Sequence, residues 1–347
     1  QITEFGDMSI LSSVSSRPSA PALSIVVIVY DMPRQALNTI TSLSPVYQQG
    51  VRPEEYEVLV IENRSQNCIP AEAVAAFPDN VRYVLREETE PTPVHAVNYG
   101  AGLARGENIC IMIDGARMVT PGVVSGLLRG HRVSAGAIVT VPGYHIGSEL
   151  QQDAVESGYD EAADKALIES VDWRNNGYGL FDVACLSESC ATGFFLPNGE
   201  SNCISMPRRM WQVLQGCDHR FNLRGGGLVN LDLYKRACEF PGTQHVILPG
   251  EGTFHQFHGG VTTGGDARDK REALIGEIRD QYRQIRGQDF QRPETQPIYL
   301  GCMPPQAIRF LELSCAQVRE HERVREPAQD AAAWSNVEPL LRQAKTR

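Results

Sequence analysis

Short apolar runs alternate with segments of helical periodicity along the first 120 residues of the chain. The apolar runs are rich in β-branched residues and have no polar face, which is typical of strands in a parallel sheet covered by helices. We predict four such strands, over residues 24–30, 56–61, 81–85 and 109–113. Helical spacing predicts helices between them, over residues 35–43, 71–77 and 92–105. This order predicts an α/β fold with a doubly wound, Rossmann-like, mostly parallel central sheet flanked by helices.

Polar side chains follow the predicted strands at the points where the strands end. Ligands of doubly wound sheets bind beyond the carboxyl ends of the strands, so these side chains are candidates for binding. They are Asp31, Glu62, Asn63, Arg64, Asp114 and Arg117. The chain has neither the GxGxxG fingerprint of dinucleotide-binding sheets nor the GxxxxGK[ST] loop of P-loop NTPases, which disfavours both classes.

The pattern changes after Pro121, where helical and strand-like segments become less regular. We predict a helix over 123–133, a strand over 137–141, a helix-prone connection over 149–170, an irregular stretch over 177–199, a helix over 207–214 and mostly helical segments over 267–286 and 304–347. We therefore divide the chain into a leader without fixed structure (1–22), a ligand-binding half (23–120), a second half that completes the same domain (121–265) and a helical C-terminal extension (266–347).

Composition narrows the classes of partner and the expected compartment. The 347 residues carry a net charge of −10, which disfavours nucleic acid and anionic membranes as partners. Nine scattered cysteines form no CxxC pair, so we expect reduced thiols in a cytoplasmic protein. We find no signal peptide, and no apolar run approaches the ~20 residues of a membrane span. Because the chain begins with Gln1, we expect a processed chain or a piece of a longer polypeptide.

Five segments, taken in order, resemble the motifs of one enzyme family. Residues 25–31, IVVIVYD, resemble the opening "SVIIPTYN" element, and 58–65, VLVIENRS, resemble "IIVVDDGS". Asn98-Tyr-Gly100 with Ala104-Arg-Gly106 resembles "RNxGxxxARG", and 109–116 with Pro121 occupies the position of "LDAD…P". Residues 221–236 resemble "GGEDxDLxxR". Together these segments resemble glycosyltransferases of the GT-A fold, close to family 2, and the resemblance runs over about residues 24–260, most of the chain.

The resemblance implies a hexosyltransferase-like enzyme that moves a sugar from a UDP- or GDP-sugar to an acceptor hydroxyl, with inversion. It implies a role in polysaccharide or glycoconjugate biosynthesis in the cytoplasm, and it leaves peripheral attachment to the inner face of the membrane open. By this resemblance, Glu62 would contact the nucleobase or ribose, and Tyr30 and Asp31 would contact the edge of the base. Asp114 would lie near the ribose and a metal. The full set of expected donor-binding residues is Tyr30, Asp31, Glu62, Arg64, Asn98, Asp114, Gly115, Ala116 and Arg117.

The sequence departs from the family pattern at the metal site. The DXD motif reads Asp114-Gly115-Ala116, so its second acid is missing. One interpretation is a divalent cation, Mn²⁺ or Mg²⁺, held by Asp114 together with His255 and His258. The other is a metal-free site in which Arg64, Arg117 and Arg224 neutralise the leaving diphosphate.

The acidic pair of the later motif is also absent, so the catalytic base is open. Asp232 and Asp218 are the candidates closest to the family position, and Glu188, Glu200 and Glu251 are acids in irregular segments. The glycine run Gly225, Gly226 and Gly227 is expected to form a wall of the acceptor site. The segment 250–260, with two phenylalanines and two histidines, suits either a lid over the donor or a packed turn.

Two other functions fit parts of the sequence. The degenerate motifs also fit a catalytically inactive module that binds sugar nucleotides or acts as a scaffold in a larger assembly or oligomer. A nucleotidyltransferase on the same sheet would require a basic, glycine-rich loop after the first strand, where only Asp31-Met-Pro-Arg34 stands.

Overall fold

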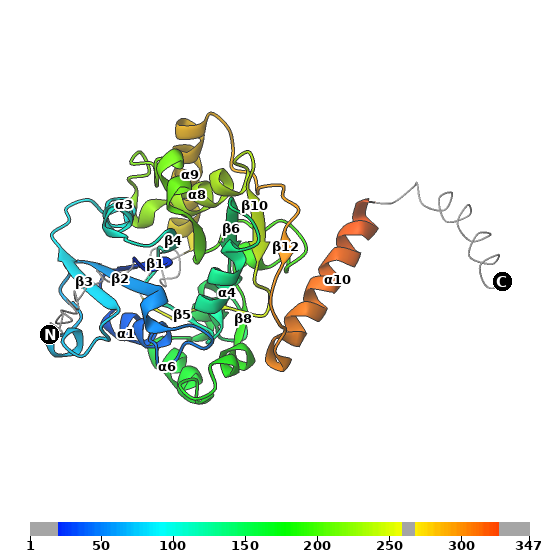
Figure 1. Cartoon of the computed structure of the whole chain (residues 1–347). Helices are drawn as coiled ribbons and strands as arrows, with labels where there is room; N and C mark the ends of the chain where they lie inside the picture. Colours follow the sequence, from blue (N-terminus) through cyan, green and yellow to red (C-terminus); the bar gives the residue numbers. More distant parts are fainter. Residues whose placement is uncertain (1–19, 259–267, 326–347) are drawn as a thin grey trace, which may run out of the picture.

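The computed structural model describes residues 20–258 and 268–325, and its centre is a mixed sheet of eight strands (Figure 1). In spatial order the strands are β12 (Ile298–Tyr299), β10 (Gln244–Ile247), β6 (Ala137–Thr140), β9 (Ile204–Pro207), β4 (Asn108–Met112), β1 (Leu23–Val29), β2 (Tyr56–Asn63) and β3 (Val81–Arg86). Every neighbouring pair is parallel except the two that β9 makes with β4 and β6. The predicted α/β fold with a mostly parallel central sheet is confirmed.

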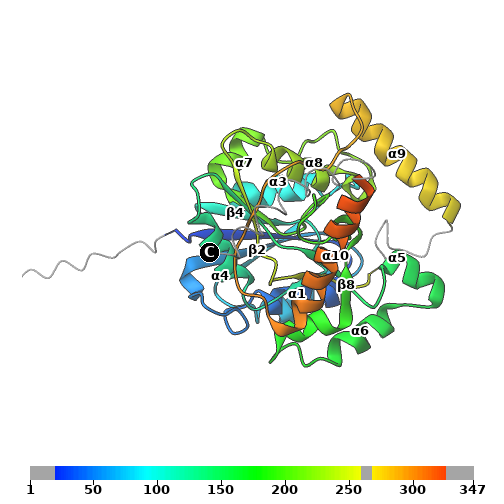
Figure 2. The same ribbon diagram turned by 90° about the vertical axis from the view of Figure 1, so that its right-hand side faces the viewer.

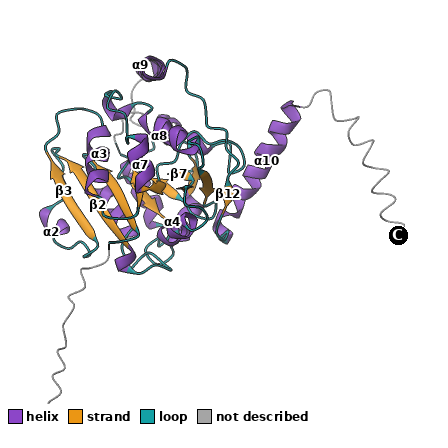
Figure 3. Cartoon of the chain, turned by 45° about the horizontal axis from the view of Figure 1, so that its top comes forward, coloured by secondary structure: helices purple, strands orange, loops and turns teal. Residues whose placement is uncertain are grey.

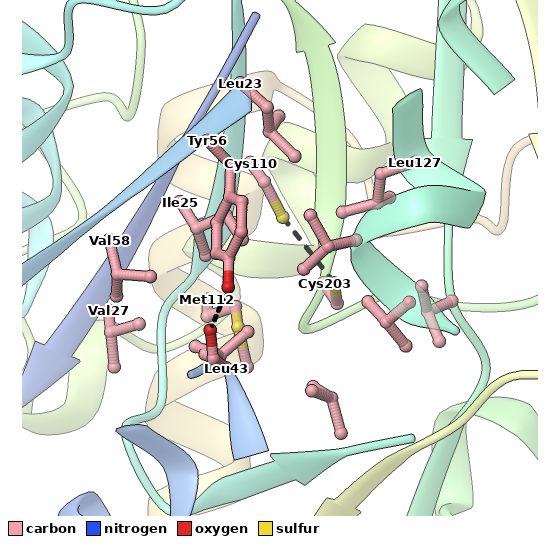
Figure 4. Close-up of a cluster of buried hydrophobic side chains, with 14 of the residues drawn as sticks. Leu23, Ile25, Val27, Leu43, Tyr56, Val58, Cys110, Met112, Leu127 and Cys203 are labelled. Atoms are coloured by element: carbon pink, nitrogen blue, oxygen red, sulfur yellow. Dashed lines mark hydrogen bonds between the residues drawn. The ribbon is translucent and has the colours of Figure 1, made fainter. Parts of the chain in front are cut away.

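Helices cover both faces of this sheet because its strands are apolar on both sides. One face packs against α1 (Pro33–Ser42) and α4 (Val123–His131), and the other against α3 (Val94–Leu103), α7 (Arg208–Leu214) and α8 (Val229–Cys238). Alternate residues of β1 enter the two cores, as the two-residue period of a strand requires. Figure 4 shows part of the first core, where Tyr56 donates a hydrogen bond to the carbonyl of Leu43 at 2.8 Å.

The remaining helices lie toward the periphery. They are α2 (Ala71–Val74), α5 (Gln151–Ala154), α6 (Glu161–Glu169), α9 (Arg268–Arg286) and α10 (Ile308–Arg325). Short 3₁₀ turns cover Pro53–Glu55, Val155–Ser157, Gly177–Val183, Glu188–Cys190, Arg224–Gly226 and Pro305–Ala307. Figure 2 shows α9 and α10 at the outside of the molecule. Within the described ranges, no helix is both long and apolar enough to cross a membrane.

A second, smaller sheet was not predicted from the sequence. Its strands, in spatial order, are β5 (Arg117–Val119), β11 (Thr253–His255), β7 (Gly143–Ile146) and β8 (Ala184–Leu186). Figure 3 labels β7 of this sheet. One face carries Met118, Phe254, Tyr144 and Leu186 into a third apolar cluster, which also contains Phe310 of α10. The other face aligns Arg117, His255, His145 and Cys185 in one cross-strand row. This polar row brings residues from four distant segments to one place.

Most predicted elements agree with the structure to within a few residues. The helix-prone connection over 149–170 contains α5 and α6, and the irregular stretch over 177–199 contains 3₁₀ turns and β8. Almost all of the predicted leader, as well as 259–267 and 326–347, lies outside the described residues. All nine cysteines lie in the described part and are free, and the Sγ atoms of Cys110 and Cys203 are 3.5 Å apart (Figure 4). The four predicted domain boundaries stay predictions.

Candidate functional site

Asp114, His255 and His258 meet beyond the carboxyl end of β4. Asp114 follows β4 by two residues, His255 ends β11 and His258 lies three residues further on. His255 Nε2 is 2.9 Å from Asp114 Oδ2, His258 Nε2 is 3.7 Å from Asp114 Oδ1, and the two Nε2 atoms are 3.2 Å apart. Three potential metal ligands therefore lie within 4.8 Å of one another. The chain thus has a possible metal site formed by one acid and two histidines.

The spacing of these atoms suits a small divalent cation. Ligand atoms at right angles around an octahedral ion, with bonds of about 2.1 Å, are about 3.0 Å apart. Mixed imidazole and carboxylate donors suit transition-metal ions such as Mn²⁺, whereas Mg²⁺ prefers oxygen alone.

Gln151 fixes the orientation of the His255 ring. The Gln151 Nε2 group donates to the carbonyls of His255 at 3.0 Å and Ile146 at 3.4 Å, so its Oε1 faces His255 Nδ1 at 2.6 Å. The Nδ1–H therefore donates to Oε1, and the unprotonated Nε2 points toward Asp114. This is the arrangement that second-shell partners impose on histidine ligands of metals. No sequence motif pointed to Gln151.

The protonation states also suit a cation. Burial lowers the pKa of His255 to about 4, so the ring is neutral at physiological pH. Although burial alone would raise the pKa of Asp114, the neighbouring histidines hold it well below its usual range. An ionised carboxylate and a neutral imidazole are the forms that bind metal.

The other two positions of the DXD motif have structural roles. Ala116 is buried, and its N–H donates to Asp114 Oδ1 at 2.9 Å, which orients the carboxylate. Gly115 packs so closely on β1 that an added Cβ would lie 2.6 Å from the carbonyl oxygen of Ile28. His255 and His258 therefore place two imidazole nitrogens beside a motif that has lost its second carboxylate.

Arg117 adds positive charge beside this cluster. Its guanidinium is buried, and its Nε lies 3.8 Å from Asp114 Oδ2. Neither Nε nor Nη1 has a hydrogen-bond partner among the described residues. Because leaving a buried charged donor unpaired is costly, this geometry favours an anionic ligand such as a phosphate.

The residues expected at the nucleoside lie at the ends of β1 and β2. Tyr30 is 56% exposed, and Asp31 has a φ of 57° and accepts from Asn67 Nδ2 at 2.9 Å. Glu62 is fully buried and accepts from the Tyr83 hydroxyl at 2.5 Å and from the Ile69 N–H. Burial raises the pKa of Glu62. In this arrangement Tyr30 is open to a ligand, whereas the Glu62 carboxylate is already hydrogen-bonded within the protein.

Two other expected donor-binding residues make contacts within the protein. Arg64 is exposed and pairs with Glu87. Asn98 exchanges two hydrogen bonds of 2.9 Å with the backbone of Cys217, so it holds the loop before α8. These contacts do not test their predicted role in binding.

Arginines surround both candidate catalytic acids near α8. Asp232 is buried and binds Arg286 at 2.6 Å and Arg236 at 2.7 Å. Asp218 binds Arg220 at 2.7 Å and Arg286 at 3.0 Å. The pKa of Asp218 lies well below its usual range, mainly because Arg220 donates hydrogen bonds to its carboxylate. Each carboxylate is bound by two guanidinium groups, and this geometry favours a structural role for both.

The glycine run before α8 has the backbone that glycine alone adopts easily. The φ angles of Gly225, Gly226 and Gly227 are 73°, 82° and 55°. The Gly225 N–H donates to the carbonyl of Pro91 at 3.1 Å, so the run packs near the start of α3. Its predicted contact with an acceptor is not tested by these features.

The described part of the proposed lid, up to His258, is firmly anchored. Phe254 is buried between Tyr144 and Phe181. The backbone of Phe257 is held by Gln35 Nε2 at 2.7 Å and by the Asp164 carboxylate at 2.9 Å. The segment thus serves as a rigid support for both histidines, and 259–260 of the predicted lid lie outside the described residues.

Comparison with known proteins adds evidence at the level of the fold. No protein-family model matches the sequence, and no curated protein matches it. The structure of S. aureus TarS 1–349 in complex with UDP-GlcNAc is similar over 86% of this chain and 72% of that chain, with a TM-score of 0.50 and 9% sequence identity. The mannosyltransferase PcManGT from Pyrobaculum calidifontis, in complex with GDP-Man and Mn²⁺, aligns over 93% of this chain and 81% of that chain, with a TM-score of 0.46 and 13% identity. The chain therefore shares its overall fold with TarS 1–349.

Proposed function

We propose that this protein is a metal-dependent glycosyltransferase that moves a sugar from a UDP- or GDP-sugar to an acceptor hydroxyl. The observation that carries the proposal is the cluster of Asp114, His255 and His258 beyond the carboxyl end of β4. The fold shared with TarS 1–349, whose structure contains UDP-GlcNAc, is consistent with such a donor. The resemblance to GT-A enzymes of family 2 and a cytoplasmic setting belong to the same proposal.

In this proposal the site binds the donor through its diphosphate. Asp114, His255 and His258 would hold Mn²⁺ or Mg²⁺, and the bound cation would neutralise charge on the diphosphate as it leaves. The two free donor groups of the Arg117 guanidinium would bind phosphate oxygens. Tyr30, exposed at the end of β1, would contact the nucleoside.

The proposed reaction is a displacement at the anomeric carbon. The acceptor oxygen forms the new bond to this carbon while the bond to the diphosphate oxygen breaks. The nucleoside diphosphate leaves with the bonding electrons, and the hydroxyl proton passes to a protein base. Attack from the face opposite the leaving group gives inversion, as the family resemblance implies.

Release of UDP or GDP from a panel of nucleotide sugars tests this function. We expect the full chain to release nucleotide from one donor when Mn²⁺ is added and to stop when EDTA removes the metal. Asp114→Ala should abolish release, whereas Asp153→Asn, which changes an exposed acid outside the cluster, should not. Nucleotide binding without release would instead support the inactive binding module, and neither binding nor release would contradict both.

A further inference from the structure

We propose that Glu200 is the base that removes the proton from the acceptor hydroxyl. This inference rests on the proposed glycosyl transfer. It assigns the catalytic base of that reaction, a role for which the geometry of the candidate acids near α8 is unsuited. Glu200 lies in the irregular segment between β8 and β9, outside the family motifs.

The topology places Glu200 at the same edge of the sheet as Asp114. Strand β9 runs antiparallel between β4 and β6, so its first residue, Ile204, pairs with Ile111 near the carboxyl end of β4 and with Thr140 at the end of β6. Asp114 follows Ile111 by three residues, and Glu200 precedes Ile204 by four. Both carboxylates therefore lie beyond the carboxyl ends of the parallel strands, where ligands bind.

A network of neutral side chains holds the Glu200 carboxylate. Oε1 accepts from Ser189 Oγ and Asn202 Nδ2, both at 3.2 Å, and Oε2 accepts from Asn230 Nδ2 at 2.7 Å. Asn230 also donates to Asn202 Oδ1 at 2.9 Å, which cross-links the network to the first turn of α8. A carboxylate offers about four acceptor positions, so one on Oε2 remains for an acceptor hydroxyl.

A second observation in this network points to a hydroxyl-bearing ligand. Asn230 is 7% exposed, and both hydrogen bonds of its Nδ2 end on oxygen acceptors, which fixes the orientation of the amide. Its Oδ1 has no hydrogen-bond partner among the described residues. A buried acceptor beside a partly satisfied carboxylate matches the hydroxyl donors of a saccharide.

The other candidate acids lack this combination of neutral hydrogen-bond partners and a remaining acceptor position. Arginines neutralise Asp218 and Asp232, Glu251 is buried against Thr120 and Tyr178, and Glu188 is exposed. Among the described residues, three ionisable groups lie against the segment between β8 and β9. They are the buried Cys190 thiol, whose pKa burial raises, Arg292, which donates to the carbonyl of Pro197 at 2.9 Å, and Tyr299, whose hydroxyl donates to the carbonyl of Phe194 at 3.0 Å.

Glu200→Gln tests the assignment because it keeps the size of the side chain and removes the base. With water as acceptor and a donor that the wild type uses, we expect kcat to fall by about 10²–10⁴-fold. Glu200→Asp, which keeps a carboxylate, should recover part of the rate that Glu200→Gln loses. UDP or GDP affinity in Mn²⁺ should stay unchanged, which shows that the variant is folded. Glu320→Gln, which changes an exposed acid of α10, is the matched control and should keep wild-type kinetics.

Three results would overturn the assignment. Glu200→Gln could turn over at a rate close to that of the wild type, Glu200→Asp could be no more active than Glu200→Gln, or Glu200→Gln could lose nucleotide binding together with turnover. Each of these removes the role of Glu200 and leaves the proposed function standing. Failure of the wild type on every donor would instead remove the proposed function, and the role of Glu200 with it.

Discussion

A single hydrogen bond, from His255 Nδ1 to Gln151 Oε1, decides which ring nitrogen of His255 faces Asp114. Gln151→Leu removes this acceptor, so the ring loses its fixed tautomer. Because second-shell partners of metal ligands contribute this kind of orientation, we expect the affinity for Mn²⁺ to fall about 10–100-fold. Isothermal titration of the full chain with Mn²⁺ measures this change. The neighbouring variant Gln152→Leu, which loses only a bond to the exposed Glu188, should bind as the wild type does. Equal affinities in both variants would contradict the orienting role.

At this scale the sequence analysis named the three clustered residues, in one of its two interpretations of the site, but not the residue that orients them. Asp114 followed from a strand end and a motif, and the two histidines followed from the family resemblance and their position after a strand-like segment. Gln151 begins the short helix α5 and Glu200 lies in an irregular segment, and the positions of both depend on tertiary contacts. Local spacing carries no signal for such contacts, so neither residue could be ranked before the structure.

The pairing between α8 and α9 depends on Asp232. Arg236 of α8 and Arg286 of α9 both bind this buried carboxylate. Asp232→Ala leaves Arg236 without its carboxylate and Arg286 with Asp218 alone, and we expect a loss of about 3 kcal/mol in the free energy of unfolding. Urea denaturation measures the loss. Glu239→Ala, which removes the i, i+4 partner of Lys235, should change stability by less than about 0.5 kcal/mol. If Asp232→Ala kept full stability and lost turnover, the structural assignment would be wrong.

The turn before α8 makes a separate prediction. Gly226 has a φ of 82°, and an added Cβ would lie 2.8 Å from a side-chain carbon of Val229. Gly226→Ala should therefore destabilise the fold by about 1–3 kcal/mol. Gly102 in α3 has no atom within 4 Å of a Cβ, so Gly102→Ala should stabilise by up to about 1 kcal/mol. Thermal unfolding compares the two, and equal shifts in Tm would contradict the argument.

Helices and strands with a long, continuous hydrophobic pattern could be predicted from the sequence, whereas the short strands of the smaller sheet could not. The strands β1, β2 and β4 are apolar runs between clear breaks, and α1 and α4 have the spacing of amphipathic helices. The strands of the smaller sheet are three or four residues long, too short for a periodic signal. β9 inserts antiparallel into the main sheet, and such an insertion depends on long-range pairing rather than on the local sequence.

For the whole molecule, a buried histidine outside the site couples stability to pH. His245 lies between the hydroxyls of Thr140 and Thr295, and burial lowers its pKa to about 4. The unfolded chain binds a proton at this residue below about pH 6.5, and the folded protein does not, so its contribution to stability falls as the pH falls. Between pH 6.5 and 5, the difference in stability between the wild type and His245→Gln should narrow by about 2 kcal/mol. Urea titrations at both pH values measure it, and a constant difference would contradict the assigned neutral state.

The net charge of −10 does not disfavour a small anionic ligand at this site. A nucleoside diphosphate is a small anion, and the buried Arg117 together with a cation at Asp114 would outweigh the distant surface charge locally. The central claim is therefore that Asp114, His255 and His258 couple nucleotide binding to a divalent cation.

Calorimetric titration of the full chain with UDP and GDP, in Mn²⁺ and in EDTA, tests this claim most directly. We predict that one nucleotide binds in Mn²⁺, that its affinity falls at least about tenfold in EDTA, and that Asp114→Ala and His258→Ala bind equally weakly with and without the metal. Binding of the same strength in Mn²⁺ and EDTA, unaffected by both substitutions, would contradict the account.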